Sequence, residues 1–411
     1  MNRRHFIIGA TGAAALLGAG GTALARRSLW NPCRASLPPD IAGHEVVRAA
    51  WEGLDPARVW DCHAHLAGIG DGGSGVTITP RMLSPLHPTE YFQRLFYLNA
   101  GCAHEAPGRV DQSYVERLHN LADGMQTGFK LMLLAFERTH DAHGRPQPEL
   151  TAFHVPNAYA RDVARANPAY FEWACSIHPY RPDCVEALEG AARDGARAVK
   201  WLPPAMGIDP ASPACDRFYT AMARLGIPLI THAGEEKAVH GAGQPAWGNP
   251  LRLRRALDHG VRVVIAHCAS LGEDQDEDRG RSGPRVSSFS LFSRLMGEQR
   301  YAGLLYGDIS AINLRNRDVA IIRLLLEQED WHPRLLFGTD YPLPGILPLV
   351  SARQLARERL LDPAAVPVLE TLREHNPLLF DFVLKRHLRS GQRHFARGVF
   401  ETRNFFDRKP A

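Results

Sequence analysis

The sequence predicts an α/β fold in which eight parallel strands close into a (β/α)8 barrel. Eight short apolar runs alternate with segments whose apolar residues recur at helical spacing. In the second half of the chain the ends of successive runs lie 32 to 41 residues apart, which leaves room for one strand and one helix. The length of 411 residues also suits a single large barrel with additions.

The strands follow from short apolar runs, beginning with VWDCHAH. These runs end near His63, Phe136, His178, Lys200, His232, His267, Asp308 and Asp340. Helical spacing is clear in SPACDRFYTAMARLG, NPLRLRRALDHG and RDVAIIRLLLEQ, which lie between the later strands. Parallel strands joined by helices are the repeating unit of such a barrel.

Two additions to the barrel are expected. The interval between the first and second strands is unusually long. It holds two helical patterns, HPTEYFQRLFYLN and QSYVERLHNLADGM, and predicts a long insertion after the first strand. An insertion at the carboxyl end of a barrel strand commonly covers an active site. The tail from about residue 363 to 411 is expected to be helical.

The chain divides into three segments. Residues 1–25 predict a signal peptide, residues 26–44 a linker rich in Pro and Ser, and residues 45–411 the barrel domain. The leader has a basic start, an uncharged Gly/Ala-rich run and the small-residue end Ala23-Leu24-Ala25.

Within the leader, Arg3-Arg4-His5-Phe6-Ile7 resembles the twin-arginine export motif, although Asn2 stands where Ser or Thr is usual. The expected partner is therefore the twin-arginine export machinery. The expected location is the bacterial periplasm or the exterior, and an uncleaved inner-membrane anchor is the alternative.

Composition narrows the function classes. Hydrophobic residues make up 45% and charged residues 22%, as in ordinary soluble enzymes. The net charge of +4 is partly due to the leader, so nucleic acid is not an expected partner. A small-molecule substrate is expected, and a homo-oligomer stays open. Seven cysteines without a Cys-x-x-Cys pair argue against a zinc knuckle and allow one or two disulfides in an oxidising compartment.

Polar side chains recur where the predicted strands end. Each alone has a structural explanation, because a lone histidine at a strand end is usually a hydrogen-bonding residue. In a closed barrel, however, the carboxyl ends of the strands form one ring, so these residues meet at one mouth. His63 and His65 lie two apart and share a face of the first strand, and neutral imidazole is the commonest metal ligand. The pattern predicts a metal site.

Five motifs together resemble the amidohydrolase superfamily, and in particular the amidohydrolase-related family that also holds metal-dependent decarboxylases. They are DCHAH, VKWLPPAMGIDP, LITHAG, VIAHC and LLFGTDYP, and the resemblance spans about residues 57 to 385. It implies a TIM barrel, a metal site and hydrolytic chemistry. Too few residues precede the barrel for the N-terminal β-sandwich of many superfamily hydrolases, so we expect none.

The resemblance also implies roles for individual residues. The metal ligands would be His63, His65, Lys200, His232, His267 and Asp340. Lys200 would bind through a carbamate formed with carbon dioxide, since an ammonium has no lone pair. Asp340 would also take a proton from the nucleophilic water, and His267 would ligate a second metal or polarise the substrate carbonyl. We expect one or two divalent ions, zinc first, with manganese or iron as alternatives.

Weaker candidates lie at the end of the third run. His178 and Arg181 are candidate substrate-binding residues there, with Arg181 as a clamp for a carboxylate. Asp308 is a candidate hydrogen-bonding partner of the metal-ligating side chains.

Three functions are compatible with these residues. The favoured one is a metal-dependent hydrolase that cleaves an amide, lactone or ester bond of a small molecule. A non-oxidative decarboxylase on the same barrel is the alternative, and a non-catalytic periplasmic binding barrel is the least favoured.

Overall fold

A closed ring of parallel strands lies at the centre of the molecule. The computed structural model describes residues 29–103, 106–237, 239, 244–280 and 282–407. Within them, the ring is built from β1 (Trp60–His65), β3 (Lys130–Leu134), β5 (Phe171–Ala174), β6 (Val199–Trp201), β7 (Leu229–Thr231), β8 (Val263–Ile265), β11 (Leu305–Asp308) and β12 (Leu335–Leu336). Parallel bridges Cys175–Val199 and Ala64–Tyr341 join its two sheets at both edges. The predicted (β/α)8 TIM barrel is confirmed.

Alternate strand residues fill the interior of the barrel. One buried cluster holds Trp60, Cys62, Met132, Leu134, Ala174, Ala198, Ile230, Val264 and Leu336, with one or two residues from each of seven strands or strand starts, and the partly buried Tyr306 of β11 packs against it. Phe406, from the short helix α18 (Arg403–Phe406) of the tail, belongs to the same cluster. The period of two along each strand therefore separates this inner core from the larger core under the helices.

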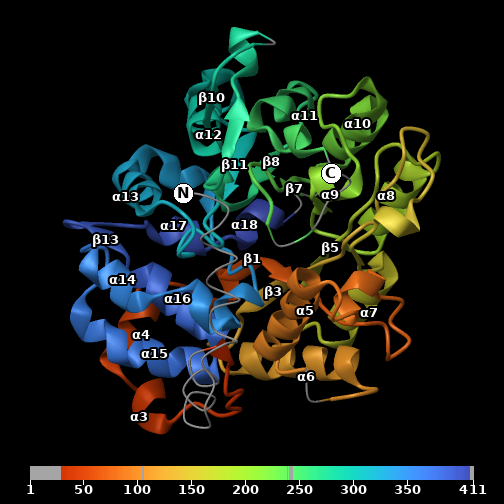
Figure 1. Cartoon of the computed structure of the whole chain (residues 1–411). Coiled ribbons are helices and arrows are strands. Elements are labelled where there is room, and N and C mark those ends of the chain that lie inside the picture. Colours follow the sequence, from red (N-terminus) through yellow and green to blue (C-terminus); the bar gives the residue numbers. More distant parts are fainter. Residues whose placement is uncertain (1–28, 104–105, 238, 240–243, 281, 408–411) are drawn as a thin grey trace.

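Helices surround the strands, as Figure 1 shows for α10 to α13. The helices that follow the later strands are α7 (Asn157–Ala166), α8 (Cys184–Arg193), α9 (Pro203–Met206), α10 (Asp216–Leu225), α11 (Arg254–Asp258), α12 (Ser288–Gly297) and α13 (Val319–Glu327). Helix α10 is amphipathic, because its buried residues Phe218, Tyr219 and Met222 recur at helical spacing on the face that packs against the barrel. It ends at Gly226, whose φ of 64° is a left-handed conformation that glycine adopts without strain.

The predicted insertion after β1 contains α5 (Pro88–Ala100) and α6 (Val110–Asp123). Three antiparallel strand pairs complete the sheet structure of the described residues: β2 (Thr77–Ile78) with β4 (Phe153–His154), β9 (Glu273–Gln275) with β10 (Arg285–Ser287), and β13 (Arg389–Ser390) with β14 (Arg393–His394). The first of these ties the insertion to the segment after β3, at the carboxyl end of the barrel strands.

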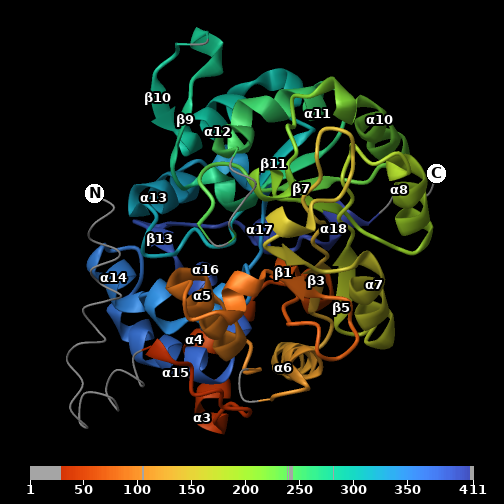
Figure 2. The ribbon, with the colours of Figure 1, turned by 45° about the vertical axis from the view of Figure 1, so that its right-hand side comes forward.

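The two ends of the described chain pack on each other. Helices α3 (Pro39–Ala42) and α4 (Glu45–Trp51) lie beside the tail helices α15 (Val366–His375) and α16 (Pro377–His387) in both views (Figures 1 and 2). The same part of the chain also contains α14 (Ala352–Arg357) and α17 (Arg397–Phe400). Trp51 and Phe382 anchor this contact, with ring centroids 4.2 Å apart. The helical tail predicted from the sequence is confirmed.

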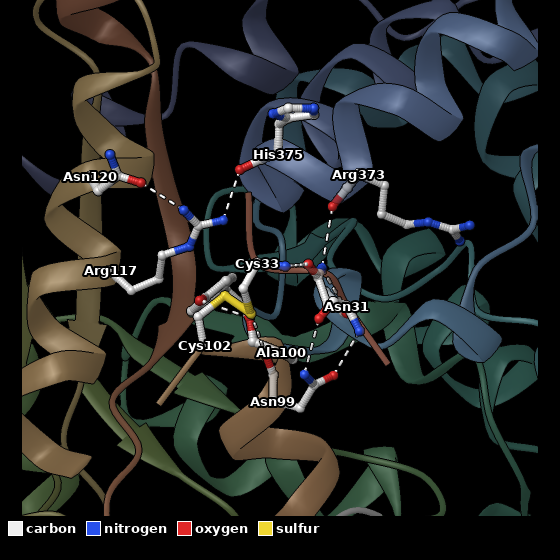
Figure 3. The surroundings of a disulfide bond; sticks show 11 residues. Asn31, Cys33, Asn99, Ala100, Cys102, Arg117, Asn120, Arg373 and His375 are labelled. Atoms are coloured by element: carbon white, nitrogen blue, oxygen red, sulfur yellow. Dashed lines mark hydrogen bonds between the residues drawn. A yellow bond between two sulfur atoms is a disulfide. The ribbon is translucent and has the colours of Figure 1, made fainter. Parts of the chain in front are cut away.

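A disulfide between Cys33 and Cys102 fastens the segment before α3 to the end of α5. Figure 3 shows Asn31 beside this bond. Its backbone N–H donates to Asn99 Oδ1 at 2.8 Å, and Asn99 Nδ2 donates back to Asn31 O at 3.1 Å. Asn31 Nδ2 also donates to the carbonyl of Gly345. The first described residues are therefore built into the wall of the insertion. The other five cysteines form no disulfide and are buried.

No described helix has the length and apolar character needed to cross a membrane. The predicted signal peptide, residues 1–25, lies outside the described residues.

Removing the disulfide should lower the stability of the protein. The bond joins residues 69 apart in sequence, and closing a loop of that size removes chain entropy worth about 4 kcal/mol from the unfolded state. We expect the double variant Cys33→Ala/Cys102→Ala to melt several degrees below the wild type, measured by circular dichroism. Dithiothreitol should lower the wild-type Tm to that of the double variant and leave the variant unchanged. Equal melting of the two oxidised proteins would contradict this.

Candidate active site

His63 and His65 stand at the carboxyl end of β1 and project from one face of it. His63 Nδ1 lies 2.9 Å from Asp308 Oδ2 at the end of β11, which orients the buried imidazole ring. Its other nitrogen, Nε2, is then available to the centre of the site and lies 3.5 Å from Asp340 Oδ1. His65 Nε2 lies 3.1 Å from the same carboxylate oxygen. The two histidines therefore converge on Asp340, as the strand period predicts.

His267 lies two residues beyond β8 in an unusual turn. His267, Cys268 and Ala269 have φ values of 55°, 51° and 49°, a left-handed conformation that L-residues rarely adopt. Asp308 Oδ1 accepts the backbone N–H of His267 at 2.9 Å, and Ser310 Oγ lies 2.8 Å from its Nδ1. These contacts hold the ring so that Nε2 lies 3.7 Å from an Asp340 oxygen.

His232 directly follows β7 and is buried. Its Nδ1 faces Glu236 Oε2 at 3.4 Å. Its Nε2 is buried and has no hydrogen-bond partner among the described residues. A buried polar atom without a partner lowers the stability of the fold. A ligand bound by the lone pair of this nitrogen would remove that cost.

Lys200 comes from β6, where its side chain is buried. Its Nζ lies 2.9 Å from His63 Nε2, and no carboxylate within the described part of the chain forms an ion pair with it. Burial lowers the pKa of Lys200, although the charges of Asp340, Asp308 and Glu236 oppose this. Lys200 therefore belongs to the same cluster.

Electrostatics favours neutral imidazoles around an ionised carboxylate. Burial lowers the pKa of His63, His232 and His267, most strongly for His267. For Asp340, burial alone would raise the pKa, but His267, His63 and His65 act together to hold it well below its usual range. Neutral imidazole and ionised carboxylate are the forms that bind a metal ion.

The residues fit a metal ion. One ligand atom each from His63, His267 and Asp340 lie within 4.8 Å of one another, and all three residues are buried. Two more histidines border this group. His65 contacts Asp340 through Nε2, and His232 lines the same cavity with an Nε2 that has no hydrogen-bond partner among the described residues. His63 and His232 also line one cavity with Lys200, His267 and Asp340. The arrangement offers nitrogen and oxygen donors of the kind that zinc and other divalent ions accept.

Packing beneath the cluster fixes Asp340. Gly338 approaches β1 so closely that a Cβ there would lie 2.8 Å from the Cβ of His63, so a larger residue would displace that ligand. The Gly338 carbonyl accepts a hydrogen bond from Lys385 Nζ at 2.8 Å. Lys385 is itself fully buried in an ion pair with Asp381, and both residues come from α16. The tail thus supports the loop that carries Asp340.

The cluster forms the floor of a cavity of about 110 Å³ that is partly open to solvent. The insertion supplies much of its wall, including Leu66, Ile78, Met82, Arg94, Tyr97 and Leu98. Other walls come from Phe136, Phe153, Leu202, Val239 and Leu343. A mainly apolar pocket with a few convergent polar groups is typical of a small-molecule site.

Two predicted residues lie elsewhere. Neither His178 nor Arg181 is among the described residues that line the cavity. His178 is buried, with Nε2 3.1 Å from the carbonyl of Met206, and burial lowers its pKa to about 3. Arg181 forms ion pairs with Glu137 and Asp183, both at 2.7 Å. The strand β5 ends at Ala174, so these residues follow a turn that carries them away from the cluster.

Sequence reasoning missed several residues of the site. Ser310 stands two residues after Asp308, and the same spacing argument that paired His63 with His65 would have found it. Arg94 and Tyr97 lie one helical turn apart on α5, but nothing in the sequence places that helix over the barrel mouth.

Comparison with known proteins gives a family match. The model of a family described as amidohydrolase matches residues 60–367. No curated protein matches the sequence significantly.

Solved structures that match this chain are distant from it in sequence. An uncharacterised TIM-barrel protein from Bordetella bronchiseptica is 16% identical, with 76% of this chain and 98% of that chain covered and a TM-score of 0.45. A 4-oxalomesaconate hydratase from Rhodopseudomonas palustris is 13% identical, with 85% and 95% covered and a TM-score of 0.41. A 5-carboxyvanillate decarboxylase from Sphingomonas paucimobilis is 12% identical, with 80% and 96% covered and a TM-score of 0.38.

The buried ion pair under the cluster gives a prediction for stability. Lys385→Met should lower the free energy of unfolding by about 3–5 kcal/mol, because it leaves the Asp381 carboxylate buried and uncompensated. Urea unfolding measures this loss. The double variant Lys385→Met/Asp381→Asn removes both charges and should recover most of the stability. If the single variant is as stable as the double variant, an uncompensated charge on Asp381 is not the cause of the loss, and the prediction is wrong.

Proposed function

The chain belongs to the amidohydrolase family, and on that premise we propose that it is a metal-dependent hydrolase that cleaves an amide, lactone or ester bond of a small molecule. The observation that carries the proposal is the convergence of His63, His267 and Asp340 on one point, beside the unpartnered Nε2 of His232. This group forms the floor of a mainly apolar cavity that is partly open to solvent, the kind of lining typical of a small-molecule site.

The residues that would hold the metal are His63, His65, His232, His267 and Asp340, and zinc is the ion we expect first, with manganese or iron as alternatives. A divalent ion bound there supplies Lewis acidity that lowers the pKa of water from about 16 to around 7. Asp308 and Ser310 keep the rings of His63 and His267 in the orientation that presents Nε2 to the site.

Asp340 is the proposed proton acceptor. Its carboxylate is ionised and has two oxygens, one near His65 and the other near His267. A carboxylate accepts a proton on one oxygen while the other keeps its own contact. As the alternative to holding a metal ion, His267 would orient or polarise the carbonyl of the substrate, because its Nε2 faces the same carboxylate across the cavity floor.

Lys200 is the proposed source of a further ligand. As a neutral amine it would add to carbon dioxide, forming an N–C bond and releasing one proton, which gives a carbamate with two oxygens. Its burial without a paired carboxylate in the described chain favours the neutral amine. The oxygens of a carbamate would supply ligands for a site with two metal ions. An unmodified Lys200 would supply none, and the site would then hold one metal ion.

The location is proposed from the leader together with the disulfide. Residues 1–25 suit export by the twin-arginine machinery into the periplasm. The disulfide between Cys33 and Cys102 supports this proposal, since such bonds persist in oxidising compartments and are rare in the cytosol.

Metal removal tests the proposed chemistry. Dialysis against a chelator should abolish hydrolysis of a panel of lactones, esters and amides, and zinc or manganese should restore it. Asp340→Asn should reduce kcat by about 10²–10⁴-fold, the usual contribution of a positioned proton acceptor. His143→Ala, an exposed histidine outside the cavity, is the control and should keep full activity.

Other outcomes of the same experiment choose between the alternatives. Turnover that survives complete metal removal would refute the mechanism. Release of carbon dioxide from aromatic or unsaturated acids without any hydrolysis would favour the decarboxylase. Two metal ions per chain, with loss of one in Lys200→Ala, would support the carbamate; one ion and a fully active variant would exclude it.

Replacement of the twin arginines tests the location. Arg3→Lys/Arg4→Lys should leave uncleaved precursor in the cytoplasm of a bacterial host, measured by fractionation and immunoblotting. Arg26→Lys/Arg27→Lys, a matched pair outside the motif, should be exported normally. Mature protein in the periplasm in spite of the first change would rule out this route, and full-length chain in the membrane fraction would support the anchor.

A further inference from the structure

Arg94 is an unusual member of the cavity wall. It stands in the middle of α5, on the same face as Tyr97 and Leu98, which follow it by about one helical turn and also line the cavity. Its neighbours in the wall on the insertion are mainly apolar, among them Ile78 and Met82. A full positive charge beside an apolar cavity needs either solvent or an anion.

The guanidinium group is oriented but not neutralised. Arg94 Nε donates to the carbonyl of Met82 at 2.9 Å, which fixes the plane of the group. Among the described residues no carboxylate pairs with it and no acceptor binds its two terminal nitrogens. Nearby Arg81, by contrast, forms an ion pair with Glu90 at 2.7 Å. The free edge of Arg94 therefore offers two parallel N–H donors, the geometry that a carboxylate accepts.

The other charged side chains of the wall and floor already have roles. Lys200 and Asp340 belong to the metal cluster, and Glu236 contacts His232. Among the described residues that line the cavity, Arg94 is thus the charged side chain that remains to bind a ligand. One unpaired arginine matches one negative charge, which suits a carboxylate better than a doubly charged phosphate.

The position of Arg94 gives the layout of the ligand. Tyr97 lies on the side of the cluster, close enough for Asp340 and Glu236 to add to the effect of burial in raising its pKa. Arg94 lies one helical turn from Tyr97, about 4.5 Å along the axis of α5, next to Met82. Most of the other residues that line the cavity are apolar, so a group held by Arg94 shares a mainly apolar cavity with the cluster.

We propose that Arg94 binds a carboxylate of the substrate, so that the enzyme acts on an acid whose scissile amide, lactone or ester bond is joined to the carboxylate through an apolar chain or ring. This inference rests on the proposed function, because it takes the cluster of His63, His267 and Asp340 as the reacting end. Arg94 is then a specificity-determining residue supplied by the insertion rather than by the barrel.

Monohydroxamates of succinic, adipic and suberic acid test the proposal directly. The hydroxamate end binds a metal ion, the methylene chain spans the apolar space, and the distal carboxylate reaches Arg94. Each acid is compared with its methyl ester by isothermal titration calorimetry on zinc-loaded protein. At the best chain length the acid should bind at least about tenfold more tightly than the ester, as expected for a charge-assisted bidentate pair.

Three variants assign that preference to a residue. In Arg94→Gln the acid and the ester should bind equally, with the affinity for the ester unchanged, which also shows that the cavity is intact. Arg94→Lys should recover part of the preference, because it keeps the charge but loses the fork. Arg81→Gln, on the same insertion, should keep the full preference.

The outcomes separate this inference from the proposed function. Equal binding of acid and ester by the wild type at every chain length would overturn the role of Arg94, as would a preference that survives in Arg94→Gln. If the esters bind metal-free and zinc-loaded protein equally, the metal site itself is wrong, and the proposed function falls together with the inference.

Discussion

The site depends on one buried carboxylate, that of Asp308. Its two oxygens contact the ring of His63 and the backbone N–H groups of His267 and Ser310, at 2.9 to 3.0 Å. Burial would raise the pKa of Asp308, but the neighbouring histidines and Ser310 hold it well below the usual range, so the group stays charged. A charge buried this deeply must be satisfied on every side. Asp308 therefore fixes the end of β1, the turn after β8 and its own strand relative to one another.

This constraint explains how the chain tolerates strained backbone at the site. His267, Cys268, Ala269 and Asp340 all have left-handed φ values, each costing on the order of 1–2 kcal/mol for an L-residue. Two hydrogen bonds offset that cost: the N–H of His267 donates to the Asp308 carboxylate, and the N–H of Asp340 donates to the carbonyl of His63 at 2.7 Å. The gain is preorganisation, because these contacts hold the imidazoles and the carboxylate facing one another.

The floor of the site could be predicted from the sequence, and the wall could not. Strand ends of a closed barrel must meet, so the period of β1 and the spacing of later strands were enough to bring His63, His232 and Asp340 together. His178 shows the limit of that argument. Its strand ends four residues earlier, and the intervening turn directs the ring to Met206 instead. The insertion has no such periodic constraint, so the place of Arg94 follows only from tertiary contacts.

Those contacts make the first described residues part of the site. Asn31 binds both Asn99, at the end of the helix that carries Arg94, and Gly345, two residues beyond the cavity residue Leu343. Gly345 itself packs on Ala100. The disulfide of Cys33 locks this arrangement from outside, whereas the contacts of Asp308 and Asp340 hold the cluster from within the barrel. Floor and wall are also joined directly, because the hydroxyl of Tyr341, next to Asp340, donates to the carbonyl of Ala100 at 3.2 Å, and that of Tyr114 donates to the carbonyl of His65 at 2.8 Å. The position of the wall is therefore coupled to that of the reacting cluster.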